Sequence, residues 1–164
     1  MCQWVCDIVF SWTIIPYVHS RKKAEVLAFA KRLYDWVVAN LRDPADGCYW
    51  NDKQASGSIR EVKWAYNTGA MISNGVRLYK ITGEQTYLDS AIASSDGAYN
   101  YFVRPLNGLA LAYPDHDPWF TTKLVRAFID IEPYYKKVQV IISKHSSTSW
   151  IMHTKMPVIK RTVL

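Results

Sequence analysis

The sequence predicts an all-α protein built from helical hairpins of the α/α-barrel type. Over most of residues 23–135, apolar side chains recur at the three- and four-residue spacing of a helix face. One helix is apolar around much of its circumference, and a tight Thr82-Gly83 turn joins it to a helix with a single apolar stripe. Such an alternation of a buried helix with a one-sided helix is typical of an α/α barrel.

The length of 164 residues favours one domain with a substantial core. We expect a partial barrel domain over residues 1–135 and a basic tail of uncertain structure over residues 136–164. The tail contains six Lys and Arg and no Asp or Glu, which leaves 14 cations against 14 acids in the body. Because the body is electrically balanced, we do not expect it to bind nucleic acid.

The N-terminal segment MCQWVCDIVFSWTIIPYV is apolar, but it does not read as a membrane span. Asp7 interrupts it, and Pro16 follows before membrane-spanning length is reached. A basic region typical of signal peptides is also lacking. A buried helix is the favoured interpretation, and a degenerate signal segment is the alternative.

The first amphipathic helix is predicted over Lys23–Leu41 and is followed by turn dipeptides at residues 43–47. Its apolar positions are Val26, Leu27, Ala30, Leu33, Trp36, Val37 and Leu41. Asp43, Asp46 and Asp52 lack the spacing of a calcium loop, and turn formation accounts for the first two. Cys2, Cys6 and Cys48 form neither a disulfide pattern nor a zinc pattern.

The next two helices are predicted over Thr68–Ile81 and from a capping box at Thr86–Asp89 through Phe102. Gly83 is expected to end the first of them in a left-handed conformation. A fourth helix is predicted from Asp117-Pro118, an N-cap followed by proline, to about Pro133. Nothing before that point reads as a strand, whereas the VQVII run after Lys137 could pair as one.

Three separated segments resemble glycoside hydrolase family 76 and occur in the family's order. The first is AKRLYDWVVANLRDPADGCYWND, and the second is Trp64-Ala-Tyr66-Asn67-Thr-Gly69 followed by LYKITGEQTYLDSA. The third is PWFTTKLVRAFIDI. The resemblance spans about residues 21–135 and implies an (α/α)6 barrel that hydrolyses α-1,6-linked mannan without a metal or other cofactor. A ring of about twelve helices of ~11 residues needs a chain roughly twice this length, so a fragment is expected.

The resemblance also implies a retaining mechanism with two adjacent aspartates in a DD-x-x-W context. The corresponding stretch here is Cys6-Asp7-Ile-Val-Phe10-Ser-Trp12, which keeps only the second aspartate. A thiol is a poor substitute for a carboxylate beside an oxocarbenium-like carbon. Asp7 is therefore a candidate catalytic residue or an ordinary polar residue, and the first sixteen residues could also be out-of-frame sequence.

The candidate substrate-binding residues are aromatic and polar side chains expected near the cleft. Trp64 and Tyr66 are predicted to stack on sugar rings or to fill the core, and Asn67 to bind sugar hydroxyls, to act as a helix N-cap, or both. The full set is Tyr49, Trp50, Trp64, Tyr66, Asn67, Asp115, His116 and Trp119. Tyr49 and Trp50 are expected in an exposed loop at the cleft rim, with core filling as the alternative.

Three functions remain open from the sequence. The first is an impaired α-1,6-mannan hydrolase, and the second is a non-catalytic carbohydrate-binding remnant. The third is a helical-hairpin module that binds another protein, or itself, through uncovered helix faces. The expected partner is a mannan-type polysaccharide or oligosaccharide, with no membrane span. The resemblance suggests a secreted or cell-surface location, although the sequence offers no convincing signal peptide.

Overall fold

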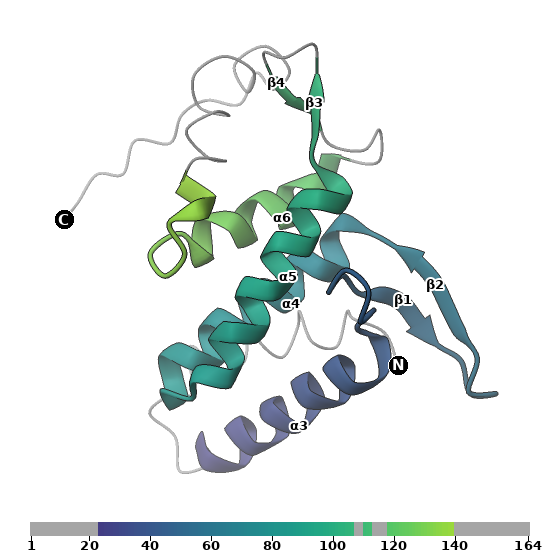
Figure 1. The fold of residues 1–164 in the computed structure, drawn as a ribbon. Helices are drawn as coiled ribbons and strands as arrows, with labels where there is room; N and C mark the ends of the chain where they lie inside the picture. The colour runs from purple at the N-terminus through teal and green to yellow at the C-terminus, as the bar shows by residue number, and fades with distance from the viewer. Residues whose placement is uncertain (1–22, 107–109, 113–117, 140–164) are drawn as a thin grey trace.

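The computed structural model describes residues 23–106, 110–112 and 118–139 (Figure 1). Its helices are α3 (Lys23–Leu41), α4 (Ala65–Thr82), α5 (Gln85–Phe102) and α6 (Pro118–Ile131). The hairpin of β1 (Trp50–Lys53) and β2 (Ile59–Lys63) connects α3 to α4, and that of β3 (Arg104–Leu106) and β4 (Ala110–Ala112) lies between α5 and α6. The predicted fold class, mostly helical and made of hairpins, is confirmed.

Helix α3 has the predicted bounds and buries one face. Ala30, Tyr34, Val37 and Leu41 are spaced three or four residues apart and are at most 3% exposed. They form a core cluster with residues of α4, among them Met71. Trp36, which was expected in the apolar stripe, lies outside this face and is 39% exposed.

Helix α4 is the central element, because every residue from Ala65 to Val76 is buried. It packs against both α5 and α6 (Figure 1). A Cβ added to Gly69 would lie 2.8 Å from Leu124 Cα, so the backbones of α4 and α6 approach each other closely at this glycine. The prediction of a helix buried on several sides is confirmed.

Between α4 and α5, the predicted left-handed Gly83 is confirmed, but the predicted capping box at the start of α5 is not. Gly83 has φ 74° and donates its backbone N–H to the Tyr79 carbonyl oxygen at 2.8 Å, which ends α4 in the left-handed conformation. The expected capping box is wrong, because α5 already begins at Gln85. Asp89 instead accepts a hydrogen bond from Gln85 Nε2 at 2.9 Å within the helix.

The expectation that no strand precedes Pro133 is wrong, since both hairpins lie before it. In the first hairpin Trp50 pairs with Lys63 and Lys53 with Ile59, and the tip contains Gly57 at φ 89°. Most side chains of β2 are exposed and those of β1 are half-buried, so neither strand shows an alternation of apolar and polar residues. The strands are held by pairing across the hairpin, which the local sequence pattern does not reveal.

Both hairpins lie at the same end of the helices (Figure 1). Helices α4 and α6 begin there, side by side, with the Tyr66 and Phe120 rings 4.5 Å apart. The short turn at Gly83 lies at the opposite end, where the rings of Tyr79 and Tyr134 are 5.5 Å apart. Variable connections on one end of a rigid helical scaffold are a usual place for a binding site.

The packed structure continues past α6. Val138 is fully buried in the core cluster that contains Leu124 and Phe128. Tyr135 donates a hydrogen bond to Asp96 on α5 at 2.7 Å, and Lys137 forms an ion pair with the same carboxylate at 2.8 Å. Within the described residues, none of the helices is long and apolar enough to span a membrane.

Candidate functional site

Four aromatic rings gather where α4 and α6 begin. Trp64 and Tyr66 come from the start of α4, and Trp119 and Phe120 come from the first turn of α6. The Phe120 ring lies 5.6 Å from Trp64 and 4.5 Å from Tyr66, and Tyr66 and Trp119 are 5.8 Å apart. All four rings meet at an angle, as aromatic pairs prefer. We call these four residues the aromatic cluster.

A row of amides lies beside the aromatic cluster and links it to the first hairpin. Asn51 Oδ1 accepts hydrogen bonds from Asn67 Nδ2 at 3.3 Å and from the Tyr66 hydroxyl at 3.4 Å. Asn51 Nδ2 in turn donates to Asp52 Oδ2 at 2.6 Å. The hairpin and the first turn of α4 are therefore fixed to each other by side-chain amides.

The aromatic cluster grades from buried to exposed. Tyr66 is buried, Trp64 and Phe120 are half-buried, and Trp119 is 42% exposed. Lys123 Nζ lies 5.1 Å from the centre of the Trp119 ring and so adds a cation–π contact on the same helix. An exposed indole on a rigid aromatic base, with amides nearby, suits a ligand that offers both an apolar face and hydroxyl groups.

Four of the eight predicted binding residues come together in this place: Trp64, Tyr66, Asn67 and Trp119. Asn67 is not the N-cap, because α4 begins at Ala65 and its N-cap is Trp64. Asn67 lies in the first turn, fully buried, and its amide serves the contact with Asn51. Trp50 is half-buried on β1 opposite Lys63, the residue before Trp64.

Tyr49 does not occupy the exposed loop position that was expected for it. Its side chain is 0% exposed and packs with Leu41 and Met71 in the core between α3 and α4. Its backbone N–H donates to Thr68 Oγ1 at 3.1 Å, which fixes the start of the hairpin to α4. Burial raises the pKa of the Tyr49 hydroxyl, as it does for Tyr34. Asp7, Asp115 and His116 lie outside the described residues.

Sequence reasoning missed two members of the site, Asn51 and Phe120. Asn51 lies next to the predicted Trp50, but its role depends on the hairpin, which turns it towards α4. Phe120 lies within the predicted fourth helix, but no binding role was predicted for it. A signal for it existed, because Trp119 and Phe120 are adjacent rings directly after a helix-starting proline.

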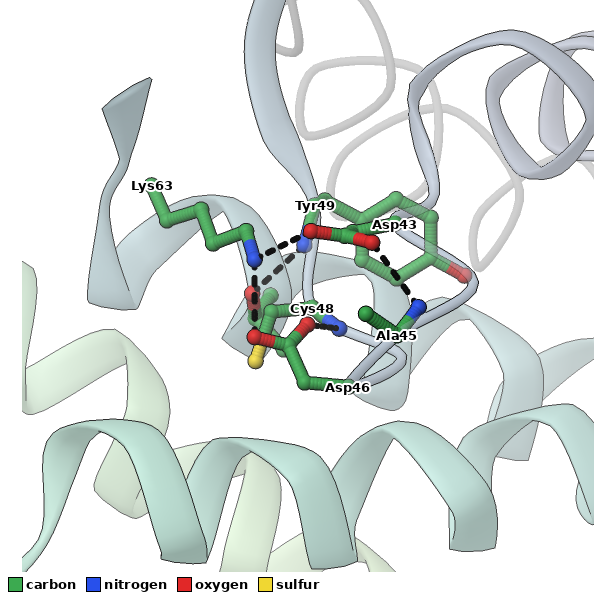
Figure 2. Close-up of polar contacts among 7 residues, drawn as sticks. Asp43, Ala45, Asp46, Cys48, Tyr49 and Lys63 are labelled. Atoms are coloured by element: carbon green, nitrogen blue, oxygen red, sulfur yellow. Dashed lines mark hydrogen bonds and ion pairs between the residues drawn. The ribbon is translucent and has the colours of Figure 1, made fainter. Parts of the chain in front are cut away.

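The loop before the hairpin is held by one lysine and two aspartates. Figure 2 shows the Lys63 ammonium between Asp43 and Asp46, at 2.5 Å and 2.7 Å from their carboxylates. The other oxygen of each aspartate accepts a backbone N–H, from Ala45 at 2.8 Å and from Cys48 at 2.9 Å. The predicted turn chemistry of Asp43 and Asp46 is confirmed.

The ion pairs in this loop shift the pKa values of their members. The hydrogen bond from Lys63, with that from Ala45, lowers the pKa of Asp43. Burial disfavours the charged form of Lys63, but the hydrogen bonds to Asp43 and Asp46 outweigh it and raise the pKa of the ammonium. Burial also raises the pKa of the Cys48 thiol to about 12, so this cysteine stays protonated and unreactive at neutral pH.

Among the described residues, no group of three or more His, Cys, Asp or Glu side chains is placed to hold a metal ion. Asp43 and Asp46 share an ion pair with Lys63, and Asp52 lies 3.6 Å from Arg60. The polar groups beside the aromatic cluster are the Asn51 and Asn67 amides, the Tyr66 hydroxyl and the Asp52 carboxylate.

Paired helices with long connections at one end, and an aromatic cluster beside those connections, define part of an α/α barrel. The model of glycosyl hydrolase family 76 matches residues 17–114, which is more than half of the sequence. The chain belongs to this family. A comparison with curated proteins gave no match.

Solved structures of family 76 share the fold. A mannosidase from Bacteroides thetaiotaomicron is 25% identical with a TM-score of 0.66, and the match covers 77% of this chain and 36% of that one. An α-mannanase from the same organism is 27% identical with a TM-score of 0.65, covering 87% and 36% of the two chains. These neighbours are (α/α)6 barrels, and the described helices form a part of such a barrel.

A third neighbour contains a bound glycan. It is an α-1,6-mannanase from Salegentibacter sp., in an inactive variant with two consecutive aspartates replaced by asparagine, in complex with α-1,6-mannotriose. It is 27% identical with a TM-score of 0.63, and the match covers 78% of this chain and 41% of that one. The present chain thus spans about two fifths or less of the length of these three structures.

Proposed function

We propose that this chain is the glycan-binding part of a family 76 enzyme that hydrolyses α-1,6-linked mannan. The observation that supports this most directly is the aromatic cluster at the start of α4 and α6, with Trp119 exposed at its edge. A mannose ring has an apolar C–H face that stacks on an indole, and its hydroxyls bond to amides such as those beside the cluster. A structural neighbour binds α-1,6-mannotriose, which gives the ligand class.

In the intact enzyme, hydrolysis would follow the retaining route with two carboxylates. One carboxylate attacks the anomeric carbon while the other, as an acid, protonates the leaving glycosidic oxygen. A water molecule, deprotonated by the second group, then attacks the anomeric carbon and releases the first carboxylate with the configuration retained. Cys6-Asp7 supplies one carboxylate in place of two, so we propose weak or absent hydrolysis by this chain.

Sugar binding is tested by titrating the purified full chain with α-1,6-mannotriose and following tryptophan fluorescence or heat. Trp119→Ala is expected to weaken binding about tenfold, because a stacking ring is lost. Trp36→Ala is the matched control, since Trp36 is also a tryptophan about two fifths exposed, but lies on α3. Equal affinities for the two variants would contradict a binding role for the aromatic cluster.

Hydrolysis is tested by measuring reducing ends released from soluble α-1,6-mannan. For an impaired hydrolase we expect a release that is weak but above the background without protein. Robust hydrolysis that disappears in Asp7→Asn would overturn the proposal of an impaired enzyme and would assign Asp7 to the catalytic machinery.

The second candidate, a carbohydrate-binding remnant without catalysis, is favoured by the same exposed ring and by the single carboxylate at Cys6-Asp7. It predicts affinity for α-1,6-mannotriose together with complete inactivity on mannan. Measurable affinity in the titration combined with no release of reducing ends would favour it over the impaired hydrolase.

A further inference from the structure

We infer that the outer side of α5 carries a second carbohydrate-binding site, a groove for one or two neutral sugar rings. The groove is separate from the aromatic cluster. It lies between the loop of residues 42–47 and five residues of α5, and it has a volume of about 790 Å³. This volume falls in the range of small-molecule sites. The α5 residues are Ala93, Asp96, Gly97, Asn100 and Tyr101. We call it the outer groove.

The walls of the outer groove offer the groups that neutral sugars use. Tyr101 is 46% exposed, and Asn100 beside it is also exposed. The Lys63 ammonium lies over the Tyr101 ring, 5.0 Å from its centre, so a sugar would stack on the other face of the ring, beside the amide. The edge-on contact with Phe102, at 4.8 Å between ring centres, holds the tyrosine ring in place. A tyrosine face binds the apolar side of a pyranose, while an amide both donates to and accepts from its hydroxyls.

Arg42 lines the outer groove and brings a positive charge to it. Its Nε is buried and has no hydrogen-bond partner among the described residues. The guanidinium lies beside Gly47, where a Cβ would come within 3.2 Å of Nη2. A ligand hydroxyl in the groove cannot reach the buried Nε, so Arg42 contributes to the groove through the charge of its guanidinium.

The charges around the outer groove are balanced, which favours a neutral ligand over an anion. Lys63 pairs with both Asp43 and Asp46, whose carboxylates point towards the ammonium in Figure 2. Asp96 is paired with Lys137. In and around the groove the three cations are Arg42, Lys63 and Lys137, and the three acids are Asp43, Asp46 and Asp96. A phosphate would therefore meet carboxylates as well as the guanidinium.

The backbone that forms the outer groove is rigid. A Cβ added to Gly97 would clash with the carbonyl oxygen of Asp46, so the loop packs directly on the backbone of α5. Gly47 adopts φ 74° and allows the loop to turn there. A preformed groove loses little entropy when it binds a ligand, which is what a sugar site of modest affinity requires.

The test is a titration of the ¹⁵N-labelled full chain with α-1,6-mannotriose, followed by amide chemical shifts. This probe is chosen because of the proposed function. The amides of Gly47, Gly97, Asn100 and Tyr101 are expected to shift together along one binding curve. Tyr101→Ala should raise the Kd of this curve about five- to tenfold. Tyr134→Ala is the control, since Tyr134 is an exposed tyrosine at the opposite end of the helices.

The outcomes separate this inference from the proposed function. If Trp119→Ala removes shifts in the aromatic cluster but leaves those in the outer groove, the second site stands by itself. If mannotriose moves only outer-groove amides, the second site stands and the proposed role of the aromatic cluster fails. Shifts confined to the aromatic cluster would overturn the outer groove as a sugar site. Shifts there with inorganic phosphate but not with mannotriose would overturn the assignment to neutral ligands.

Discussion

At the scale of single residues, Lys63 holds the loop that borders the outer groove. Its side chain is 9% exposed, and its ammonium contacts two carboxylates that also accept backbone N–H groups. Removing the ammonium would leave two partly buried carboxylates without a cation. We expect Lys63→Gln to lower the free energy of unfolding at pH 7 by about 2 kcal/mol, measured by urea denaturation.

The same variant should change the pH dependence of stability. Asp43 has a pKa below its ordinary value of 3.8, so its contribution is present above pH 3.8 and is lost as pH falls through the lower folded value. Lys63 has a raised pKa, so its contribution is present below pH 10.5 and is lost as pH rises through the folded value. Without Lys63 the pKa of Asp43 rises, and the decline in acid should become shallower.

The measurement is a series of urea unfolding curves between about pH 5 and pH 2. Lys53→Gln is the control, because Lys53 Nζ lies 2.8 Å from the neutral Asn40 Oδ1 and its removal takes one cation from the same hairpin. If Lys63→Gln and Lys53→Gln give the same acid decline, Lys63 is not the cause of the low Asp43 pKa.

At the scale of secondary structure, the sequence predicted the helices well because their core faces repeat within one element. The bounds of α3 and the end of α5 at Phe102 agree with the prediction. The start of α4 was placed three residues late, at Thr68, because Asn67 is a favoured N-cap residue and burial overrode that preference. Local propensity gave way to tertiary packing.

The hairpins and the inner edge of the candidate site could not be predicted in the same way. Asn51 contacts Asn67 across 16 positions in sequence, and this contact exists only once β1 and β2 pair. Tyr49 follows a turn, which suggested exposure, but the turn folds back and places the ring between α3 and α4. Trp64, Tyr66 and Trp119 could be named as candidates because they are aromatic residues close to predicted helix starts, in segments that resemble the family.

The turn after α4 allows the energetic cost of a left-handed backbone conformation to be measured without packing effects. Gly83 has φ 74°, and a Cβ placed on it would have no atom within 4 Å. Gly83→Ala should therefore cost about 1 kcal/mol in free energy of unfolding, from backbone conformation alone. Gly83→Asn should cost less, since asparagine tolerates the left-handed region better. An alanine variant as stable as the wild type would show that the turn does not need this conformation.

At the scale of the whole molecule, the described helices form part of a ring, and apolar side chains remain exposed on its outermost helices. On α6 these include Trp119 at 42% and Ile129 at 47% exposure, and on α3 they include Phe29 at 44% and Trp36 at 39%. The matches to the three solved family 76 structures cover only 36% to 41% of those chains. Exposed apolar side chains are typical of surfaces that associate when they lie close together.

We therefore predict that the chain associates with itself through α6 in a concentration-dependent way. Ile129→Lys should lower the average mass in sedimentation velocity, because a charge in the apolar contact is costly. Val62→Lys is the control: Val62 is 45% exposed, close to Ile129, but lies on β2. Since Trp119 lies on α6 and also in the aromatic cluster, saturating α-1,6-mannotriose should reduce association if the two surfaces overlap. A wild-type chain that stays monomeric across the concentration range, or equal masses for the two variants, would contradict association through α6.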